Sequence, residues 1–414
     1  MAGLARRRIV AGLDVGTSKV AVVVGEIAEQ EEVRVIGVGE ARSSGLRKGM
    51  VVDIDSVAKA IQSAVEKAEQ MSGHPIETVY AGITGAHIAS FNNRGVVAIS
   101  RRNREITVED VHRVLQAAQI VPVPPDHEII HVIPREYIVD GHDGIMDPVA
   151  MSGTRLEVEA SIVTGIQTAI QNLLKSVSRA GLQVEELVLN PLAAAETVMQ
   201  PAEKELGAVL IDIGGGTTEI ALFDEGTLWY TAVLPVGGDL VTSDLAVGLR
   251  TPLAQAEEIK KKHGCVLAEL MPSDELVEIP NVGKQEFRRV SRKTIASIIE
   301  PRILEILALI KERIYDSGYK GMLPGGVVLT GGVASMDGLV ELAAEELQMP
   351  VRVGLPGKIG GLTDMVNFGS YATVTGLVLY GARQVALTEA APTADPLLGG
   401  FMSKLRLWLR DFFN

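Results

Sequence analysis

The sequence predicts an α/β fold with two related lobes, for three reasons. Residues 9–24 (IVAGLDVGTSKVAVVV) and 208–223 (AVLIDIGGGTTEIALF) share one pattern, in which an apolar β-rich run leads into an aspartate, a turn of small residues and a second apolar run. Residues 327–339 (VVLTGGVASMDGL) run from an apolar strand into a glycine turn. The chain has 414 residues, which is too long for one ordinary core. A repeat about 200 residues apart indicates two lobes that face each other.

Each of the two matched segments is predicted to form a β-hairpin with a polar tip. Glycines let the backbone come close to a ligand, and free N–H groups with hydroxyls form an anion cradle. Asp14 and Asp212 are suited to hold the waters of a Mg²⁺ ion. One such hairpin alone could be a plain tight turn, but the matched pair favours a site that grips the phosphates of a nucleotide. Its candidate residues are Asp14, Gly16, Thr17, Ser18, Lys19, Asp212, Gly214, Gly215, Gly216, Thr217 and Thr218.

Composition excludes several classes of protein. The formal net charge of -13 argues against a general nucleic-acid binder, because the chain would repel phosphates at long range. Cys265 is the single cysteine, so there is no intramolecular disulfide and no thiolate metal cluster. We expect no signal peptide, and no apolar run approaches the roughly 18 residues that span a bilayer. Any membrane contact is therefore expected to be peripheral.

The segment HEIIH (127–131) matches a zinc-protease pattern, but that pattern needs a helix to bring both histidines to one metal. Prolines precede and follow the segment, and isoleucine and valine are frequent around it. These features predict a strand, so we expect no zinc site.

The two hairpins and the late Thr-Gly-Gly turn, in this order, resemble the actin, Hsp70 and sugar-kinase superfamily, from about residue 8 to residue 385. The resemblance implies an actin-like fold of two lobes with ATP and Mg²⁺ in the cleft. Residues 190–196 (NPLAAAE) resemble its first connecting helix, and residues 256–264 (AEEIKKKHG) resemble the helix that reaches the ribose in bacterial actins. The resemblance adds the nucleotide-binding candidates Gly237, Gly238, Asp239, Glu257, Lys260, Gly331, Gly332 and Val333.

An insertion in the first lobe indicates which family of this superfamily the chain resembles. Residues 83–115 and 141–165 are predicted to form strands, a helix from about Thr107 and further strands. This arrangement resembles the inserted α+β subdomain of the FtsA family of bacterial cell-division proteins. PilM-like pilus-assembly proteins share a similar insertion, so that branch stays an alternative.

The last residues, 401–414 (FMSKLRLWLRDFFN), are predicted to form an amphipathic helix with an apolar arc of roughly 140°. Aromatic residues with basic flanks are typical of a helix that lies in the plane of a membrane surface. The alternative is a helix that docks on its own protein. The FtsA resemblance, which implies a membrane-targeting tail, favours the membrane. The membrane-contacting candidates are Phe401, Met402, Lys404, Leu405, Arg406, Trp408, Leu409, Arg410, Phe412 and Phe413.

The resemblance to FtsA implies a function and a set of partners. It implies an ATP-binding scaffold at the division site, on the cytoplasmic face of the cell membrane, that forms filaments with itself and tethers the FtsZ ring. It also implies further division partners. The C-terminal tail of FtsZ is expected on the second lobe, at a basic cluster that could otherwise be a solvated helix face. The cluster consists of Arg288, Arg289, Arg292, Lys293 and Arg302.

Enzymatic turnover is expected to be slow at most. In the related bacterial actin MreB, the residue before the proline of the connecting helix is a glutamate, whereas this chain has Asn190. An amide can position water but cannot accept its proton. ATP is thus expected to act chiefly as a conformational ligand. The alternative from another class is a phosphotransferase of the sugar-kinase branch, for which the sequence offers no clear catalytic carboxylate beyond the two aspartates.

These predictions give the following boundaries. The first-lobe core is expected over residues 1–82, 165–206 and 366–387, with the inserted subdomain over 83–164. The second-lobe core is expected over 207–234 and 304–365, with a partner-binding subdomain over 235–303. A linker over 388–400 joins the core to the amphipathic helix over 401–414.

Overall fold

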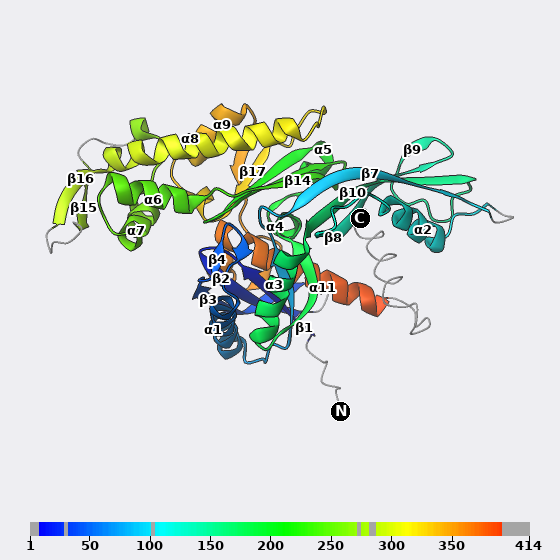
Figure 1. The fold of residues 1–414 in the computed structure, drawn as a ribbon, viewed down its shortest axis with the longest axis horizontal. Coiled ribbons are helices and arrows are strands. Elements are labelled where there is room, and N and C mark those ends of the chain that lie inside the picture. The colour runs from blue at the N-terminus through cyan, green and yellow to red at the C-terminus, as the bar shows by residue number, and fades with distance from the viewer. Residues whose placement is uncertain (1–7, 29–31, 101–103, 271–274, 281–286, 391–414) are drawn as a thin grey trace.

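The computed structural model describes residues 8–28, 32–100, 104–270, 275–280 and 287–390. Figure 1 shows one long upper layer, formed by the second lobe and the inserted subdomain, with the first lobe below its middle. Among the described residues, no helix is both long enough and apolar enough to cross a membrane.

The first lobe is built on a six-stranded sheet in the order β11-β6-β1-β2-β3-β19. Helices cover both of its faces, which explains why its strands are almost continuously apolar. Side chains of α1 and α3 join one core cluster with one face of β1 and β2, and α11 packs on the opposite face. The elements are β1 (Arg8–Val15), β2 (Lys19–Ile27), β3 (Val33–Arg42), β6 (Thr78–Ile83), β11 (Gln183–Leu189), β19 (Gly360–Gly361), α1 (Ile54–Ser72), α3 (Gln167–Arg179) and α11 (Ala372–Ala390).

The second lobe is built on a five-stranded sheet in the order β14-β13-β12-β17-β18. One face packs on α6, α7, α8 and α9, and the other face packs on α4, which follows β11. The elements are β12 (Ala208–Ile213), β13 (Thr218–Asp224), β14 (Thr227–Leu234), β17 (Val327–Thr330), β18 (Val351–Val353), α4 (Asn190–Val198), α6 (Gly238–Gly248), α7 (Leu253–His263), α8 (Arg292–Asp316) and α9 (Leu339–Leu347).

The two sheets repeat one topology. In the first lobe, β1, β2 and β3 pair antiparallel, while β6 and then β11 extend the sheet in parallel from β1. In the second lobe, β12, β13 and β14 pair antiparallel, while β17 and then β18 extend the sheet in parallel from β12. The internal duplication that the sequence indicates is therefore a duplication of the lobe.

Helices α4 and α11 cross where the two lobes meet. A Cβ atom on Gly376 of α11 would lie only 1.8 Å from the carbonyl oxygen of Ala193 in α4, so the two backbones are in contact at this point. The crossing holds the two lobes at the base of the cleft, and only glycine fits at this place in α11.

The inserted subdomain contains a four-stranded sheet in the order β7-β10-β8-β9, with α2 packed on one face. Helix α2 begins after Thr107, whose backbone and hydroxyl both bond to Asp110, so the predicted helix start is confirmed. The segment HEIIH lies in β8 and is a strand, also as predicted. The elements are β7 (Ala89–Ala98), β8 (His127–Val139), β9 (His142–Ile145), β10 (Arg155–Ile166) and α2 (Val108–Ala118).

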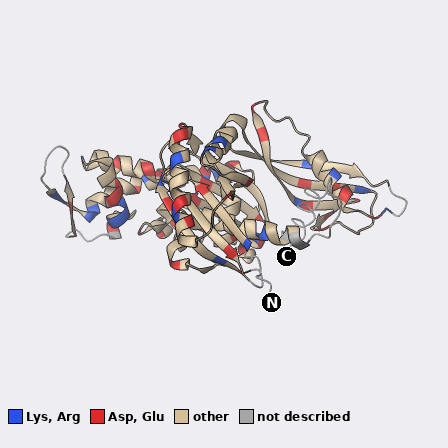
Figure 2. Cartoon of the chain, turned by 90° about the horizontal axis from the view of Figure 1, so that it is seen from below, with Lys and Arg blue, Asp and Glu red and all other residues tan. Residues whose placement is uncertain are grey.

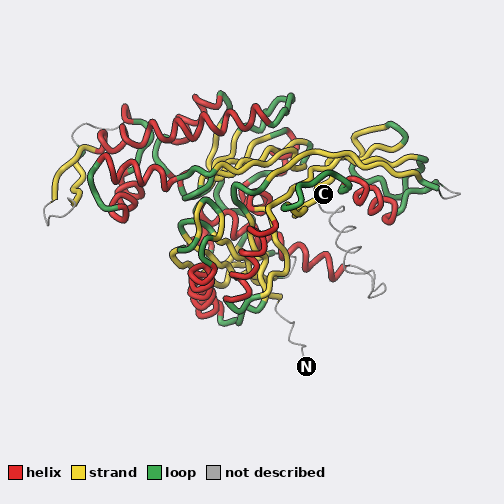
Figure 3. The backbone as a smooth tube through the Cα atoms, viewed as in Figure 1, coloured by secondary structure: helices red, strands yellow, loops and turns green. Residues whose placement is uncertain are grey.

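The inserted subdomain contacts both lobes. The Ser90 hydroxyl at the start of β7 donates to the carbonyl oxygen of Thr231 in β14 at 2.8 Å and accepts from its N–H at 3.1 Å. The contact to the first lobe is made by β11, where the N–H of Leu189 donates to Nε2 of His131 in β8 at 3.0 Å. In Figure 3 the strands of the second lobe and of the insert run together along the top of the molecule.

Short elements complete the described fold. A β4–β5 hairpin follows β3, a two-stranded ribbon of β15 and β16 precedes α8, and three 3₁₀ turns lie at Ala268–Leu270, Val333–Ser335 and Gly369–Tyr371. The remaining elements are β4 (Leu46–Arg47), β5 (Met50–Val51), β15 (Leu276–Pro280), β16 (Phe287–Ser291), α5 (Pro201–Leu206) and α10 (Thr363–Val366).

Candidate functional site: the cleft between two matched hairpins

The two matched segments form hairpins with the same turn. In the β1–β2 hairpin the N–H of Gly16 donates to the carbonyl oxygen of Lys19 at 3.0 Å. In the β12–β13 hairpin the N–H of Gly214 donates to the carbonyl oxygen of Thr217 at 2.9 Å. Each bond begins two residues after the aspartate, so the predicted hairpins and their equivalence are confirmed.

The two tips meet across the cleft. A Cβ atom on Gly215 would lie 1.9 Å from the Ser18 hydroxyl oxygen, and one on Gly216 would lie 2.7 Å from the Thr17 hydroxyl oxygen. Larger residues at these positions would therefore collide with the opposite tip. The hydroxyls and backbone N–H groups of both tips are gathered in one place, as an anion cradle requires.

Asp14 and Asp212 end the two central strands and lie near each other. Burial raises the pKa of Asp14 to about 6, against the attraction of Lys19. Burial and then the neighbouring charge of Asp14 raise the pKa of Asp212 to about 7, and the Thr373 hydroxyl, at 3.5 Å, lowers it in part. Two half-buried carboxylates that repel each other are a donor set that fits a divalent cation with a preference for oxygen, such as Mg²⁺.

The segment after β14 lies against the second hairpin. The N–H of Gly238 donates to the carbonyl oxygen of Gly214 at 2.9 Å, and that of Asp239 donates to Gly215 at 2.8 Å. Burial raises the pKa of Asp239 despite the nearby Lys260. The start of α6 is thus fixed at the hairpin tip, and the structure brings these predicted residues together with the phosphate candidates.

The third glycine turn also reaches this point. A Cβ atom on Gly331 would lie 2.3 Å from a carboxylate oxygen of Asp212, and the residue has φ +90. A 3₁₀ turn at Val333–Ser335 follows, and α9 begins at Leu339. Gly332 and Val333 therefore lie on a tight turn directly after the glycine that approaches Asp212.

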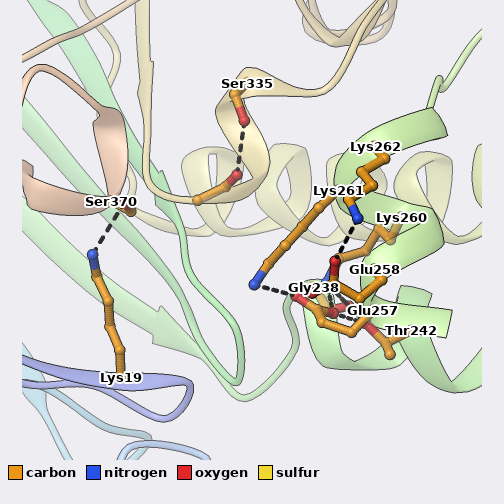
Figure 4. A network of polar contacts seen from close by, with 11 residues as sticks. Lys19, Gly238, Thr242, Glu257, Glu258, Lys260, Lys261, Lys262, Ser335 and Ser370 are labelled. Carbon is orange, nitrogen blue, oxygen red and sulfur yellow. Dashed lines mark hydrogen bonds and ion pairs between the residues drawn. The ribbon is translucent and has the colours of Figure 1, made fainter. Parts of the chain in front are cut away.

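Lys260 and Lys261 have different surroundings on α7. The Lys260 ammonium is 9% exposed and lies 3.0 Å from the Gly238 carbonyl oxygen, 2.8 Å from the Thr242 hydroxyl and 2.6 Å from Glu257, so it ties α7 to α6 (Figure 4). Lys261 is 64% exposed and lies 3.4 Å from Glu257, and its charge acts on Lys19 and Glu40 of the first lobe. Sequence reasoning selected Lys260 and missed Lys261, because spacing on a helix does not reveal which of two adjacent lysines is the more exposed.

Glu219 is a second residue that sequence reasoning missed. It pairs across the β12–β13 hairpin with Asp212, whereas Ala21 stands opposite Asp14 in the first hairpin. Burial, followed by the charge of Asp212, raises the pKa of Glu219 well above its usual value. The register of the hairpin, counted from the turn, is the signal that could have identified this carboxyl group.

Glu219 lies beside Asn190 and Thr84. Both neighbours act on the carboxyl group of Glu219 through side-chain hydrogen bonding, which lowers its pKa in part. Yet one oxygen of Glu219, the amide oxygen of Asn190 and the hydroxyl of Thr84 have no well-formed hydrogen bond within the protein. Buried polar atoms of this kind normally have partners, and a water molecule would supply them. Asn190, which is predicted to position water, therefore has a carboxyl neighbour that can accept a proton from that water.

Most of the predicted partner-binding cations already have intramolecular partners. Arg292 lies 2.6 Å from Asp337 and 3.4 Å from Glu275, and Arg302 lies 2.6 Å from Asp244. Arg289 lies 3.2 Å from Glu278, and Arg288 donates to the carbonyl oxygen of Leu249. Lys293, at the start of α8, is exposed. The cluster is thus also a structural element that ties β16 and α8 to their neighbours.

The same end of the molecule exposes apolar side chains. Val247 is 77% exposed, Leu253 is 62% exposed and Phe287 is 70% exposed. The bond of Arg288 to Leu249 joins β16 to the turn between α6 and α7, and Val247 and Leu253 lie on either side of that turn. Blue segments mark the basic residues of this end at the left of Figure 2. The linker predicted over residues 388–400 begins too early, because α11 continues to Ala390. The rest of the predicted linker and the amphipathic helix predicted over residues 401–414 lie outside the described residues.

Comparison with protein families finds two matches. The model described as "Cell division protein FtsA" matches residues 209–376, and "SHS2 domain inserted in FTSA" matches residues 85–164. Among curated proteins, FtsA of Pseudomonas aeruginosa is 42% identical over the whole of both chains. FtsA of Escherichia coli is 40% identical over 98% of this chain and 99% of its own, and FtsA of Bacillus subtilis is 43% identical over 91% and 84%.

Solved structures share the fold at low identity. The PilM–PilN type IV pilus biogenesis complex matches with a TM-score of 0.64 and 17% identity, covering 91% of this chain and 99% of that one. MreB5 of Spiroplasma citri bound to ADP matches with a TM-score of 0.55 and 13% identity, covering 92% and 98%. These likenesses confirm the actin-like fold, here with an inserted SHS2 domain.

The full-length relatives decide among the branches that the sequence left open. They are 40% to 43% identical, whereas the pilus-assembly structure is 17% identical and shares the fold alone. The chain belongs to the FtsA family of cell division proteins.

Proposed function

We propose that this chain is an ATP-binding scaffold that assembles on the inner face of the cytoplasmic membrane at the division site and tethers the FtsZ ring to it. The observation that carries the nucleotide part is the meeting of three glycine turns around two half-buried carboxylates, Asp14 and Asp212. Neighbours with the same fold are described as bound to ADP and to AMPPNP.

Within the cleft, the hydroxyls and N–H groups of both hairpin tips would hold the phosphates, and Asp14 with Asp212 would hold Mg²⁺ through water. When bound, Mg²⁺ neutralises phosphate charge and orients the phosphate oxygens. Lys261 is exposed and its charge acts on Lys19 of the first lobe, and the bonded pair of Glu257 and Lys260 ties α7 to α6.

Glu219 and Asn190 support slow ATP hydrolysis as a secondary activity. The Asn190 amide would orient a water molecule, and the Glu219 carboxylate would accept its proton. Burial beside another carboxylate raises the pKa of Glu219, so its ionised form takes up a proton more readily than that of an ordinary glutamate. Asn190 on the connecting helix has no carboxyl group, and Glu219 of the second hairpin would supply one instead.

Three surfaces support the scaffold role. The amphipathic segment over residues 401–414 would bind anionic lipid, and many weak tails on one filament would bind by avidity. Head-to-tail contacts of the two lobes would generate an open filament; a neighbour of the same fold, MamK, is described as a double helical filament. Lys293 with exposed Val247, Leu253 and Phe287 would receive an acidic and apolar peptide, which we assign to the C-terminal tail of FtsZ.

A sedimentation assay with anionic vesicles and FtsZ tests this function. With the full chain and Mg-ATP, FtsZ is expected to pellet with the vesicles. A chain truncated at Pro396 is expected to leave FtsZ in the supernatant. Leu409→Glu on the apolar arc should act like the truncation, whereas Asn414→Glu adds the same charge on the opposite side and should pellet normally.

The peptide surface has its own variant in this assay. Lys293→Glu should leave the chain on the vesicles and release FtsZ, while Lys320→Glu, exposed elsewhere on the second lobe, should release neither. Vesicle-bound FtsZ that survives the Pro396 truncation would contradict the tether function.

A further inference from the structure

Lys19 at the base of the first hairpin is held by three residues from two other parts of the chain. Its ammonium lies 3.1 Å from a carboxylate oxygen of Glu40 in β3 and 3.4 Å from the Ser370 hydroxyl. It also lies 3.4 Å from the ring centroid of Tyr371. Figure 4 shows Lys19 pointing toward Ser370, with the α7 network on the other side of the cleft.

Tyr371 is the centre of this arrangement. Its hydroxyl donates to the same Glu40 oxygen at 2.6 Å, so the ring lies under the Lys19 ammonium while the hydroxyl fixes the carboxylate that pairs with it. The segment that carries Tyr371 packs closely against the third glycine turn, because a Cβ atom on Gly369 would lie 2.7 Å from the carbonyl oxygen of Gly331. Tyr371 therefore joins the third turn to the first hairpin.

We propose that Tyr371 is a positioning residue for nucleotide binding, which acts by holding Lys19, together with Glu40 and Ser370, toward the phosphates. This inference rests on the proposed nucleotide-binding function. Nothing in the sequence patterns or in the family comparisons assigns a role to Tyr371, Glu40 or Ser370.

The donor count of Lys19 supports this assignment. An ammonium group has three N–H donors and no acceptor. Glu40 and Ser370 occupy two directions, and the Tyr371 ring lies under the cation, as a cation–π contact requires. The remaining donor capacity is available to an anion at the adjoining tip of Thr17 and Ser18. A lysine side chain free in solution has many rotamers, so fixing it beforehand lowers the entropic cost of binding phosphate.

The charges around Lys19 favour an anionic ligand. Glu40 is the ion-pair partner of Lys19, and Tyr371 stabilises that carboxylate, whose pKa lies below its usual value despite the opposing effect of burial. From the second lobe, Lys261 acts on both Lys19 and Glu40. Two cations from opposite lobes thus face one region of the cleft, and a nucleotide phosphate would relieve their repulsion.

Competition binding with Mg-ATP, Mg-ADP and adenosine on the full chain tests the assignment. Tyr371→Leu, which removes both the ring contact and the hydroxyl, is expected to weaken Mg-ATP and Mg-ADP binding about tenfold or more. It should leave adenosine binding unchanged, because Lys19 acts on the phosphates. Tyr371→Phe keeps the ring and loses only the bond to Glu40, so a loss of roughly threefold is expected.

Tyr380→Phe is the matched control. It removes a hydroxyl that bonds to Glu186 at 2.7 Å, in α11, the helix that follows the turn of Tyr371, and it should leave nucleotide binding unchanged. Tyr371→Leu in a Lys19→Met background distinguishes a role through Lys19 from a purely structural role of Tyr371. Tyr371→Leu should cost little further affinity once Lys19 is absent, because the two residues act as one unit.

The outcomes separate this inference from the proposed function. Absence of any nucleotide binding by the unmodified chain would overturn both. Normal binding by the unmodified chain and by Tyr371→Leu, or an undiminished penalty in the Lys19→Met background, would overturn the positioning role alone. If Tyr371→Leu does not fold, Tyr371→Phe and Glu40→Gln with unchanged melting temperatures decide by the same criterion.

Discussion

Glu219→Gln is expected to lower the rate of ATP turnover by about 100-fold or more while it changes ATP affinity by less than about threefold. The substitution keeps the size of the side chain and its place beside Asp212 and Asn190, but an amide cannot accept the proton of the attacking water. Single-turnover phosphate release gives the rate, and competition binding gives the affinity.

Glu225→Gln is the matched control for this prediction. Glu225 is exposed at the turn between β13 and β14, so the same chemical change takes place in the same sheet but outside the cleft. Turnover by Glu225→Gln should equal that of the unmodified chain. Unchanged turnover by Glu219→Gln would remove Glu219 from the mechanism and leave Asn190 as the water-positioning residue alone.

Gly376→Ala is expected to destabilise the chain by about 2–3 kcal/mol, although replacing glycine by alanine inside a helix normally stabilises it by about 1 kcal/mol. The added methyl group would lie 1.8 Å from the carbonyl oxygen of Ala193, which is backbone and cannot swing aside. Helices α4 and α11 would have to separate at the base of the cleft. Denaturant unfolding measures the change in free energy.

Gly248→Ala provides the comparison for the helix crossing. Its methyl group would meet only the flexible end of the Ile298 side chain, at 2.9 Å. We expect this variant to be neutral or slightly stabilised. Equal or greater stability of Gly376→Ala would show that the two helices are not held together at this point.

Patterns that are local in sequence predicted their structures well. The two hairpins, the connecting helix after β11, the helix after Thr107 and the strand nature of HEIIH all depend on residues within about a dozen positions of one another. An aspartate before a turn of small residues is recognisable because the turn itself needs those residues. The nucleotide-binding candidates of both tips therefore come together as expected.

Features that depend on distant partners could not be predicted from such patterns. Tyr371 meets Glu40 across 331 positions of sequence, and no local pattern marks either residue. The basic residues near α8 were counted without their counter-ions, because Asp244 and Asp337 approach Arg302 and Arg292 only in the folded chain. Glu219 lies between these cases, since hairpin register alone would have placed it beside Asp212.

The most direct test of the central claim, that the cleft binds Mg-ATP through its paired carboxylates, is calorimetric titration of the full chain with ATP in the presence and absence of Mg²⁺. We expect saturable binding of ATP that needs Mg²⁺. The affinity should be at least tenfold weaker in Asp212→Asn. It should be unchanged in Asp316→Asn, which alters an exposed aspartate at the end of α8. No binding at millimolar ATP, or equal affinity with and without Mg²⁺, would contradict it.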